Sequence, residues 1–220
     1  MNTPKSREGN LFRYTVYLIG YLMAVGVLKL VTRKATLQIW DVILYILITA
    51  MVLLFYIYRF NREQRYFQRQ FTLPWLGDFG LTISLTLFIT ATRVLVMYLQ
   101  TSNYISQYGF QTAYLKNEST SMFWFLILAE GIIMPILQEF LATGFLFNYA
   151  FRKSVPAVAL TGIFCSGLIF SALSCQFSPA LFLINILYGA LFAWSYLYTQ
   201  TLWMPMYLAI LSGILMIVMI

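Results

Sequence analysis

Long apolar runs joined by short polar links make up most of the chain. Each run is close to the roughly 20 residues that an α-helix needs to cross the hydrocarbon core of a bilayer, and the runs lack the single apolar stripe of a helix on the surface of a soluble protein. The pattern therefore predicts an all-α fold, a multi-pass transmembrane helical bundle of about seven spans. The predicted spans are residues 14–31, 38–58, 77–99, 122–151, 156–174, 179–198 and 202–220.

Composition agrees with this pattern, since 61% of the 220 residues are hydrophobic and only 10% are charged. A soluble domain has about 25% charged residues. We expect a single integral membrane domain over residues 1–220, with the lipid bilayer as its surroundings. The net charge of +7 comes mostly from basic residues in the links, so it reports topology and gives no reason to expect a nucleic-acid partner.

Basic residues gather in three segments that fall on one side of a seven-span bundle. Residues 1–13, 59–72 and 152–153 hold nine of the fourteen Lys and Arg residues. Cytoplasmic links of membrane proteins carry an excess of Lys and Arg. We therefore predict a multi-pass protein of the cell membrane with its amino terminus in the cytoplasm.

The stretch 122–151 carries polar side chains at membrane depth, namely Glu130, Gln138 and Glu139. A carboxylate near the middle of a bilayer costs about 2.5 kcal/mol or more, which makes this stretch the first candidate for a functional site. Glu139 and Thr143 are four residues apart, so a helix places them on one face. Two interpretations are open. The carboxylate faces a cavity in the bundle, or it is a buried, protonated group that ties helices together by hydrogen bonds.

Residues 134–147, MPILQEFLATGFLF, resemble the first signature of the CPBP intramembrane proteases. This family groups the CAAX proteases with bacterial bacteriocin-processing and self-immunity proteins. Its pattern is an apolar run with a proline, then Glu-Glu-x-x-x-Arg-Gly, then more apolar residues. In this chain the four signature positions are occupied by Gln138, Glu139, Thr143 and Gly144.

Three later segments continue the resemblance in the same order. Phe170 and Ser174 occupy the two ends of the family's Phe-x-x-x-His signature, and Gly189 matches a glycine between signatures. The segment LWMPMYLAILSG matches the last signature, with Ala209 at the histidine position and Gly213 at the asparagine position. The chain therefore resembles the family at positions that support the fold, and it differs at most of the positions that carry the chemistry.

The resemblance covers a CPBP-like core of about 122–216. It implies an endopeptidase in which the first Glu activates water, while histidines and other polar residues bind the reacting groups, with a metal proposed in several members. Activation of water needs a base or a bound metal ion. Of the signature residues that carry the chemistry, only Glu139 keeps its family identity here, and the chain has no histidine. One carboxylate is too few ligands for zinc, so we predict no metal and no other cofactor. The substituted family positions are Gln138, Thr143, Ser174 and Ala209.

Three classes of function follow from these residues. The first is a catalytically inactive relative, a pseudoprotease, that binds a hydrophobic peptide or a membrane-protein partner in bacteriocin immunity or in the regulation of peptide processing. The second is an active intramembrane endopeptidase that uses Glu139 by a variant mechanism. The third is a small transporter or channel subunit whose path is lined by Arg93, Glu130 and Glu139.

A presenilin-type aspartyl protease is a further alternative, because LGDF around Asp78 resembles a Gly-x-Gly-Asp motif and Asp41 supplies a second aspartate. Both aspartates lie near the starts of consecutive spans, which puts them on opposite faces of the membrane. We therefore interpret them as acidic residues at helix starts. Arg93 lies deeper in its span and is a candidate partner for Glu130 or Glu139.

Overall fold

The computed structural model describes residues 7–33, 37–63, 79–116, 119–151, 156–176 and 178–219. Every regular element within these ranges is a helix, so the predicted all-α fold is confirmed. The elements are α1 (Arg7–Thr32), α2 (Ile39–Glu63), α4 (Phe79–Thr101), α5 (Gly109–Lys116), α6 (Thr120–Leu126), η1 (Ile127–Ile133), α7 (Met134–Glu139), η2 (Phe140–Phe145), α8 (Leu146–Tyr149), α9 (Pro156–Leu173), α10 (Pro179–Thr199) and α11 (Trp203–Val218).

Six helical segments of the described chain are long and apolar enough to cross a membrane. They are α1, α2, α4, α9, α10 and one continuous segment, Thr120–Tyr149, which we call the long helix. The seventh predicted span corresponds to α11, which has only 16 residues. At 1.5 Å per residue it measures about 24 Å, short of the roughly 30 Å hydrocarbon core. The predicted multi-pass bundle is therefore confirmed, with six full-length spans and one shorter helix.

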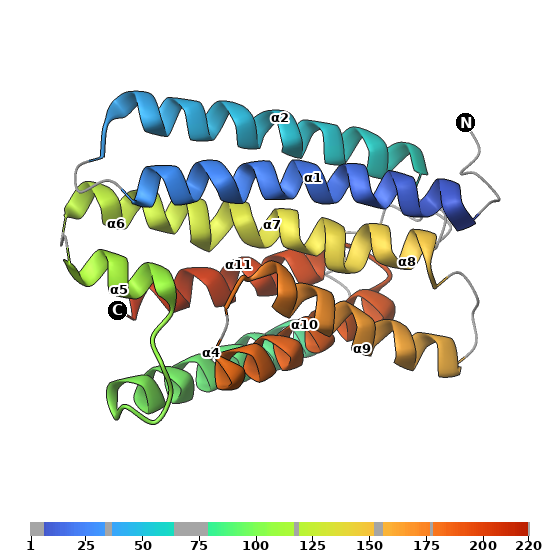
Figure 1. The fold of residues 1–220 in the computed structure, drawn as a ribbon. Coiled ribbons are helices and arrows are strands. Elements are labelled where there is room, and N and C mark those ends of the chain that lie inside the picture. Colours follow the sequence, from blue (N-terminus) through green and yellow to red (C-terminus); the bar gives the residue numbers. More distant parts are fainter. Residues whose placement is uncertain are drawn as a thin grey trace.

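The helices pack side by side around the long helix. In Figure 1, α1 and α2 lie together as one layer, the long helix runs alongside α1, and α4, α9 and α10 lie on the far side. α11 contacts η1, α7 and α4, which places it between the long helix and that far side. α1 begins at the end of the bundle opposite to the one where α11 ends (Figure 1).

Two segments are more helical than the sequence pattern predicts. The pattern predicts a polar loop over 100–120, but α5 forms within it. It also predicts a basic linker over 59–72, whereas α2 continues as far as Glu63. Charged residues mark the end of an apolar run, but they do not end a helix, because Glu and Arg are good helix formers. The rest of that linker and Asp78 lie outside the described residues.

Pro135 lies in the middle of the long helix, where the sequence predicts a kink or a division. The helix is continuous through this position and so is not divided, and it has π-helical turns in η1 and η2 on either side of α7. The amide of Met134 donates to the carbonyl of Ala129, five residues earlier. A proline ring clashes with the carbonyl four residues before it, here that of Gly131. The additional residue in the π turn relieves this conflict without breaking the helix.

Small residues allow α9 and α10 to approach at backbone distance. A Cβ atom added at Gly167 would lie 2.6 Å from the backbone oxygen of Ile186, and one added at Gly189 would lie 2.6 Å from the Cβ atom of Phe170. Lipid tails are as apolar as leucine, so helix association in a bilayer depends on van der Waals packing of this kind. The pair α9–α10 is therefore held by contacts that only glycine permits.

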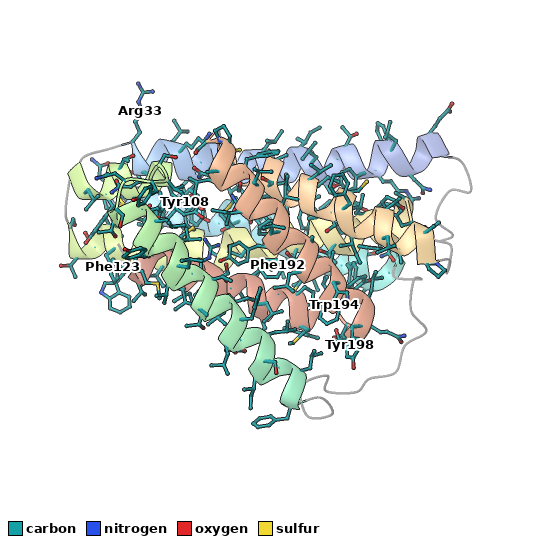
Figure 2. All side chains as sticks on the ribbon, turned by 90° about the horizontal axis from the view of Figure 1, so that it is seen from below. Arg33, Tyr108, Phe123, Phe192, Trp194 and Tyr198 are labelled. Carbon is teal, nitrogen blue, oxygen red and sulfur yellow. The ribbon has the colours of Figure 1, made fainter. Side chains whose placement is uncertain are left out.

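Large apolar side chains cover the outside of the bundle. Figure 2 shows Trp194 and Tyr198 projecting outward from α10, where their rings stack with centroids 5.5 Å apart. Exposed leucine, isoleucine, methionine and phenylalanine residues occur along α1, α2 and α4. Soluble monomers rarely expose such extended apolar surfaces. The outer surface therefore suits contact with lipid.

Substitution of Gly167 tests the close packing of α9 on α10. We expect Gly167→Ala to lower the free energy of unfolding by about 1–3 kcal/mol, because the added Cβ meets backbone atoms that cannot move aside cheaply. Gly26→Ala in α1 is the matched control, since nothing lies within 4 Å of its added Cβ. That variant should be unchanged or up to about 1 kcal/mol more stable. Thermal unfolding in detergent measures both variants. Equal effects of the two substitutions would contradict this packing.

Candidate functional site

Glu139 is the last residue of α7 and is completely buried, with 0% exposure. The Thr143 hydroxyl donates to Oε2 of Glu139 at 2.8 Å, as expected for residues one helical turn apart. The same hydroxyl lies 3.4 Å from Oγ of Ser166 in α9. Among the described residues, Oε1 of Glu139 has no hydrogen-bond partner. The carboxyl group is thus held by one hydroxyl and linked through it to a second helix.

Gln138 takes part in a different network from its neighbour Glu139. Its Nε2 donates to the Tyr21 hydroxyl at 2.9 Å, and that hydroxyl donates to the carbonyl of Leu173 at 2.7 Å. These bonds connect α7 with α1 and with the end of α9. The amide therefore acts as a link between helices, and it is directed away from the Thr143–Ser166 pair.

Ser174 and Ala209 are the residues at which the resemblance predicts histidines. Ser174 follows α9, where its hydroxyl donates to the carbonyl of Ser171 at 2.7 Å and accepts from Nδ2 of Asn185 at 2.9 Å. Ala209 in α11 is 3% exposed and belongs to an apolar cluster that includes Ala142. Within the described residues, no hydrogen bond joins Ser174 to Glu139.

The residues at the motif positions therefore lie in three different environments. Glu139 and Thr143 lie together, as their spacing predicts. Gln138 connects through Tyr21 to the residue that precedes Ser174. Ala209 packs against apolar side chains from α10 and the long helix. All of them lie in the C-terminal half of the bundle, but only one pair makes a direct polar contact.

The groups around Glu139 do not fit a zinc site. Zinc in proteins takes three or four ligands from His, Cys, Asp and Glu side chains. No group of three such side chains lies together in the described part of the chain. The side-chain oxygens nearest to Glu139 in its network are the hydroxyls of Thr143 and Ser166. This donor set does not match the metal that the resemblance implies for several family members.

Arg93 contacts neither of the acids that the sequence offers as partners. Its Nε donates to Oγ of Ser212 at 2.8 Å, and its Nη1 donates to the Tyr108 hydroxyl at 2.8 Å. No ion pair joins Arg93 to Glu130 or Glu139 in the described residues, so the expected pairing is wrong for both. Among the described residues, the three charged side chains proposed to line a transport path are therefore not joined to one another through Arg93.

A cavity of about 550 Å³ opens at the turn between α9 and α10. Ligand pockets in proteins typically enclose about 300–1,000 Å³ and are mostly apolar. The hydroxyl of Ser171 and the side chain of Gln176 are the polar groups among aliphatic and aromatic ones. The residues that line it are Ser171, Ala172, Cys175, Gln176, Pro179, Phe182 and Leu183. They flank Ser174 in sequence, so this cavity adjoins one of the motif positions.

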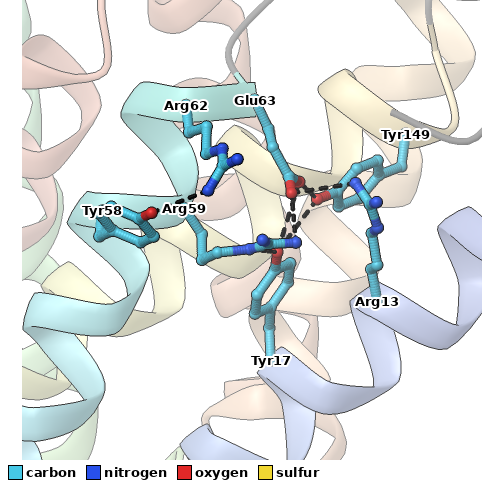
Figure 3. Close-up of polar contacts among 7 residues, drawn as sticks. All are labelled: Arg13, Tyr17, Tyr58, Arg59, Arg62, Glu63 and Tyr149. Carbon is cyan, nitrogen blue, oxygen red and sulfur yellow. Dashed lines mark hydrogen bonds and ion pairs between the residues drawn. The ribbon is translucent and has the colours of Figure 1, made fainter. Parts of the chain in front are cut away.

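A second polar cluster lies where α1 begins and α2 ends (Figure 3). Glu63 is 2% exposed there and accepts from Nη1 of Arg13 at 3.0 Å. Arg59 forms an ion pair with the same carboxylate oxygen, and the Tyr149 hydroxyl donates to the other one. The Tyr17 hydroxyl completes the cluster and accepts from Nε of Arg59 at 3.0 Å. One carboxylate thus joins α1, α2 and α8.

Sequence reasoning missed this cluster because it assigned Glu63 to a linker. Two signals were available in the chain. Arg59 and Glu63 are four residues apart, the spacing of an ion pair on a helix, and Arg13 precedes Tyr17 by the same number. Both signals depend on extending the neighbouring helices into polar sequence, which the apolar pattern does not suggest.

The fold and these sites define a multi-pass α-helical membrane protein with a buried carboxyl group in its C-terminal half. Residues 120–214 match the family of type II CAAX prenyl endopeptidase Rce1-like proteins. Over these residues the chain is similar to that family, and the resemblance to the CAAX proteases predicted from the sequence is confirmed. Comparisons with curated proteins and with solved structures gave no match.

Removal of the Glu63 carboxylate tests whether the second cluster stabilises the bundle. We expect Glu63→Ala to lower the free energy of unfolding by about 2 kcal/mol or more, because two arginines lose their shared partner. Both arginines are only about one-fifth exposed, at 22% and 21%. Glu8→Ala is the matched control, since Glu8 is exposed in the first turn of α1, and its loss should cost less than about 1 kcal/mol. Unfolding in a denaturing detergent measures both. A Glu63 variant as stable as the Glu8 variant would show that the cluster contributes nothing.

Proposed function

We propose that this protein is a non-catalytic member of the CAAX protease-like family, which binds a hydrophobic peptide or a membrane-protein partner. The observation that carries the proposal is the burial of Glu139 beside Gln138, an amide where the family has its first acid. A general base must come within hydrogen-bonding reach of the water that it activates. Glu139 has no exposed surface, and the Thr143 hydroxyl occupies one of its oxygens.

The resemblance predicts a histidine at position 209 and an asparagine at position 213. Both positions are instead occupied by small residues that pack between helices, which supports the same proposal. Ala209 is nearly fully buried in an apolar cluster. A Cβ atom added at Gly213 would lie 2.8 Å from the backbone oxygen of Gly131 and 3.1 Å from Cγ of Pro135. Position 213 has no room for the asparagine of the family while α11 keeps its present contact with the long helix. A histidine at position 209 would place a polar ring where a buried alanine lies in an apolar cluster.

The cavity at the α9–α10 turn supports a binding role. Its volume of about 550 Å³ is in the range of ligand pockets, and its walls are mostly apolar. It adjoins Ser174 without involving Glu139. A hydrophobic peptide segment is the occupant that fits this lining and the family's relation to peptides. We place the protein in the cell membrane with a cytoplasmic amino terminus, and we assign it to bacteriocin immunity or to the regulation of peptide processing.

A cleavage assay tests the absence of catalysis. Purified protein, free of other membrane proteases, is incubated with a prenylated peptide that ends in a CAAX sequence and with unprenylated hydrophobic peptides. We expect no cleavage by the wild type and the same result for Glu139→Gln. Cleavage by the wild type that Glu139→Gln abolishes would overturn the proposal and establish the alternative, an endopeptidase that uses Glu139.

Site-specific photo-crosslinking tests the binding cavity. A photoreactive amino acid replaces Leu183, which lines the cavity, or Leu160 on α9, which does not. The two leucines are similarly exposed, at 62% and 68%. We expect a labelled hydrophobic peptide to crosslink at least several-fold more at position 183, and an excess of unlabelled peptide to suppress that signal. Equal labelling at both positions would show contact through lipid alone and would remove the cavity from the proposal.

A tolerance assay tests the biological role. Expression of the wild type in a bacteriocin-sensitive strain should raise tolerance to at least one bacteriocin, and Glu139→Ala should leave that tolerance largely intact, because the role does not depend on catalysis. Tolerance that disappears in the Glu139→Ala variant, while the protein remains folded and in the membrane, would contradict a non-catalytic role.

A further inference from the structure

Arg93 carries a positive charge into the interior of the bundle. It lies within α4, eight residues before the helix ends at Thr101, and only 6% of its surface is exposed. A charged side chain at membrane depth costs several kcal/mol unless the protein supplies compensating groups. Such residues are functional-site candidates for this reason.

Within the described ranges, the groups that contact Arg93 are all neutral. Ser212 and Tyr108 accept hydrogen bonds from Nε and Nη1. The guanidinium carbon lies 4.3 Å from the ring centroid of Tyr188 and 5.9 Å from that of Tyr108, which provides cation–π contacts. Among the described residues no carboxylate lies within ion-pair distance of Arg93, whereas Arg13 and Arg59 both reach one. The hydroxyl groups and aromatic rings around Arg93 therefore reduce the free-energy cost of burying its charge, but they do not neutralise that charge.

A small cavity lies directly beside the guanidinium. Its polar lining consists of Arg93, Gln100, Tyr108 and Gln111, and apolar side chains from α4 and α11 complete it. Its volume is about 10 Å³, which is room for about one water-sized particle. Figure 2 shows Tyr108 at this place, beside the C-terminal part of α4 and next to α5.

Hydrogen-bond donors remain available around this cavity. Tyr108 uses its oxygen as an acceptor for Arg93, so its own O–H proton is left to donate. Each glutamine amide has two N–H donors. Gln100 uses one for the carbonyl of Ser106, and Gln111 uses one for the carbonyl of Met216. The described lining of the cavity thus consists of a cation, unused donors and apolar side chains, and it contains no carboxylate.

We propose that the cavity beside Arg93 is a binding site for a small monovalent anion such as chloride. The guanidinium supplies the charge, while the phenol and the amides supply directional donors, as expected for a site that binds a small anion. The bound anion neutralises the buried charge and joins α4, the start of α5 and the end of α11. The site is independent of the proposed function, because it shares no residue with Glu139 or with the cavity at the α9–α10 turn.

Anion-dependent stability tests the site. The melting temperature of the purified protein in detergent is measured in sodium chloride, sodium bromide and sodium gluconate at equal ionic strength. At about ten times the dissociation constant we expect chloride and bromide to raise the melting temperature by about 3 °C over gluconate, because binding to the folded state alone stabilises it. Equal melting temperatures in the three salts would overturn the proposal.

Three variants locate the effect. Arg93→Gln should abolish the difference between chloride and gluconate. Arg62→Gln is the matched control, since Arg62 is an exposed arginine that bonds Tyr58 at the other end of the bundle, and it should keep the difference. Glu118→Gln should also keep it, because the proposal assigns the neutralisation of Arg93 to a bound anion and not to a carboxylate of this chain. A chloride effect that survives in Arg93→Gln would assign the anion to another place and overturn the proposal.

Crystals soaked in bromide give a result that does not depend on the folding of any variant. An anomalous peak beside the guanidinium of Arg93 is expected. Ordered water in that position without anomalous signal would overturn the assignment, because an uncharged occupant leaves the buried charge without a counterion.

Discussion

Polar groups inside a bilayer must find their partners within the protein, because lipid offers none. This constraint explains most of the side-chain contacts in the bundle. Glu139 is paired with Thr143, Gln138 with Tyr21, Ser174 with Asn185, and Glu63 with Arg13. With the exception of Glu139, each of these residues is joined to a different helix or to a distant part of the chain. The polar residues of the spans therefore act as links between helices, whatever else they do.

The contacts that hold the C-terminal helices together are different from the residues that would carry chemistry. The C-terminal half keeps its architecture through close contacts of Gly167, Gly189 and Gly213, none of which needs an ionisable group. Helix association in lipid depends on packing of this type. Packing of this kind can therefore hold the helices together without ionisable groups. Gln138, at a position where the resemblance predicts an acid, bonds Tyr21 across the bundle.

The sequence predicts most of the fold because helices that face lipid are apolar over their whole length. Their positions can therefore be read from the long apolar runs. The predicted spans 156–174 and 179–198 nearly coincide with α9 and α10, each of which begins at a proline in its first turn. The contact of Glu139 with Thr143 also follows from spacing alone. Local arguments of this kind succeed because they depend only on helix geometry.

The remaining features depend on tertiary contacts that no local pattern reveals. The contacts of Glu63 could not be predicted because α2 continues into charged sequence. The partners Arg13 and Tyr149 also lie 50 and 86 residues away in the chain. Arg93 bonds Tyr108, a residue of the polar segment where the sequence predicts only a loop. The π-helical turns on either side of Pro135 depend on the position of its ring within the helix. The periodicity of apolar residues carries no information on this.

The contact between α11 and the long helix gives the proposed loss of activity a structural basis beyond single substitutions. Gly213 lies so close to Gly131 that even a methyl group would meet its carbonyl oxygen at 2.8 Å. Ala209, one turn earlier in α11, is buried in an apolar cluster. A longer side chain at position 213 requires α11 to stand further from the long helix. The close approach of the two helices at Gly213 is therefore incompatible with the asparagine that the resemblance predicts there, and this agrees with the proposed loss of activity.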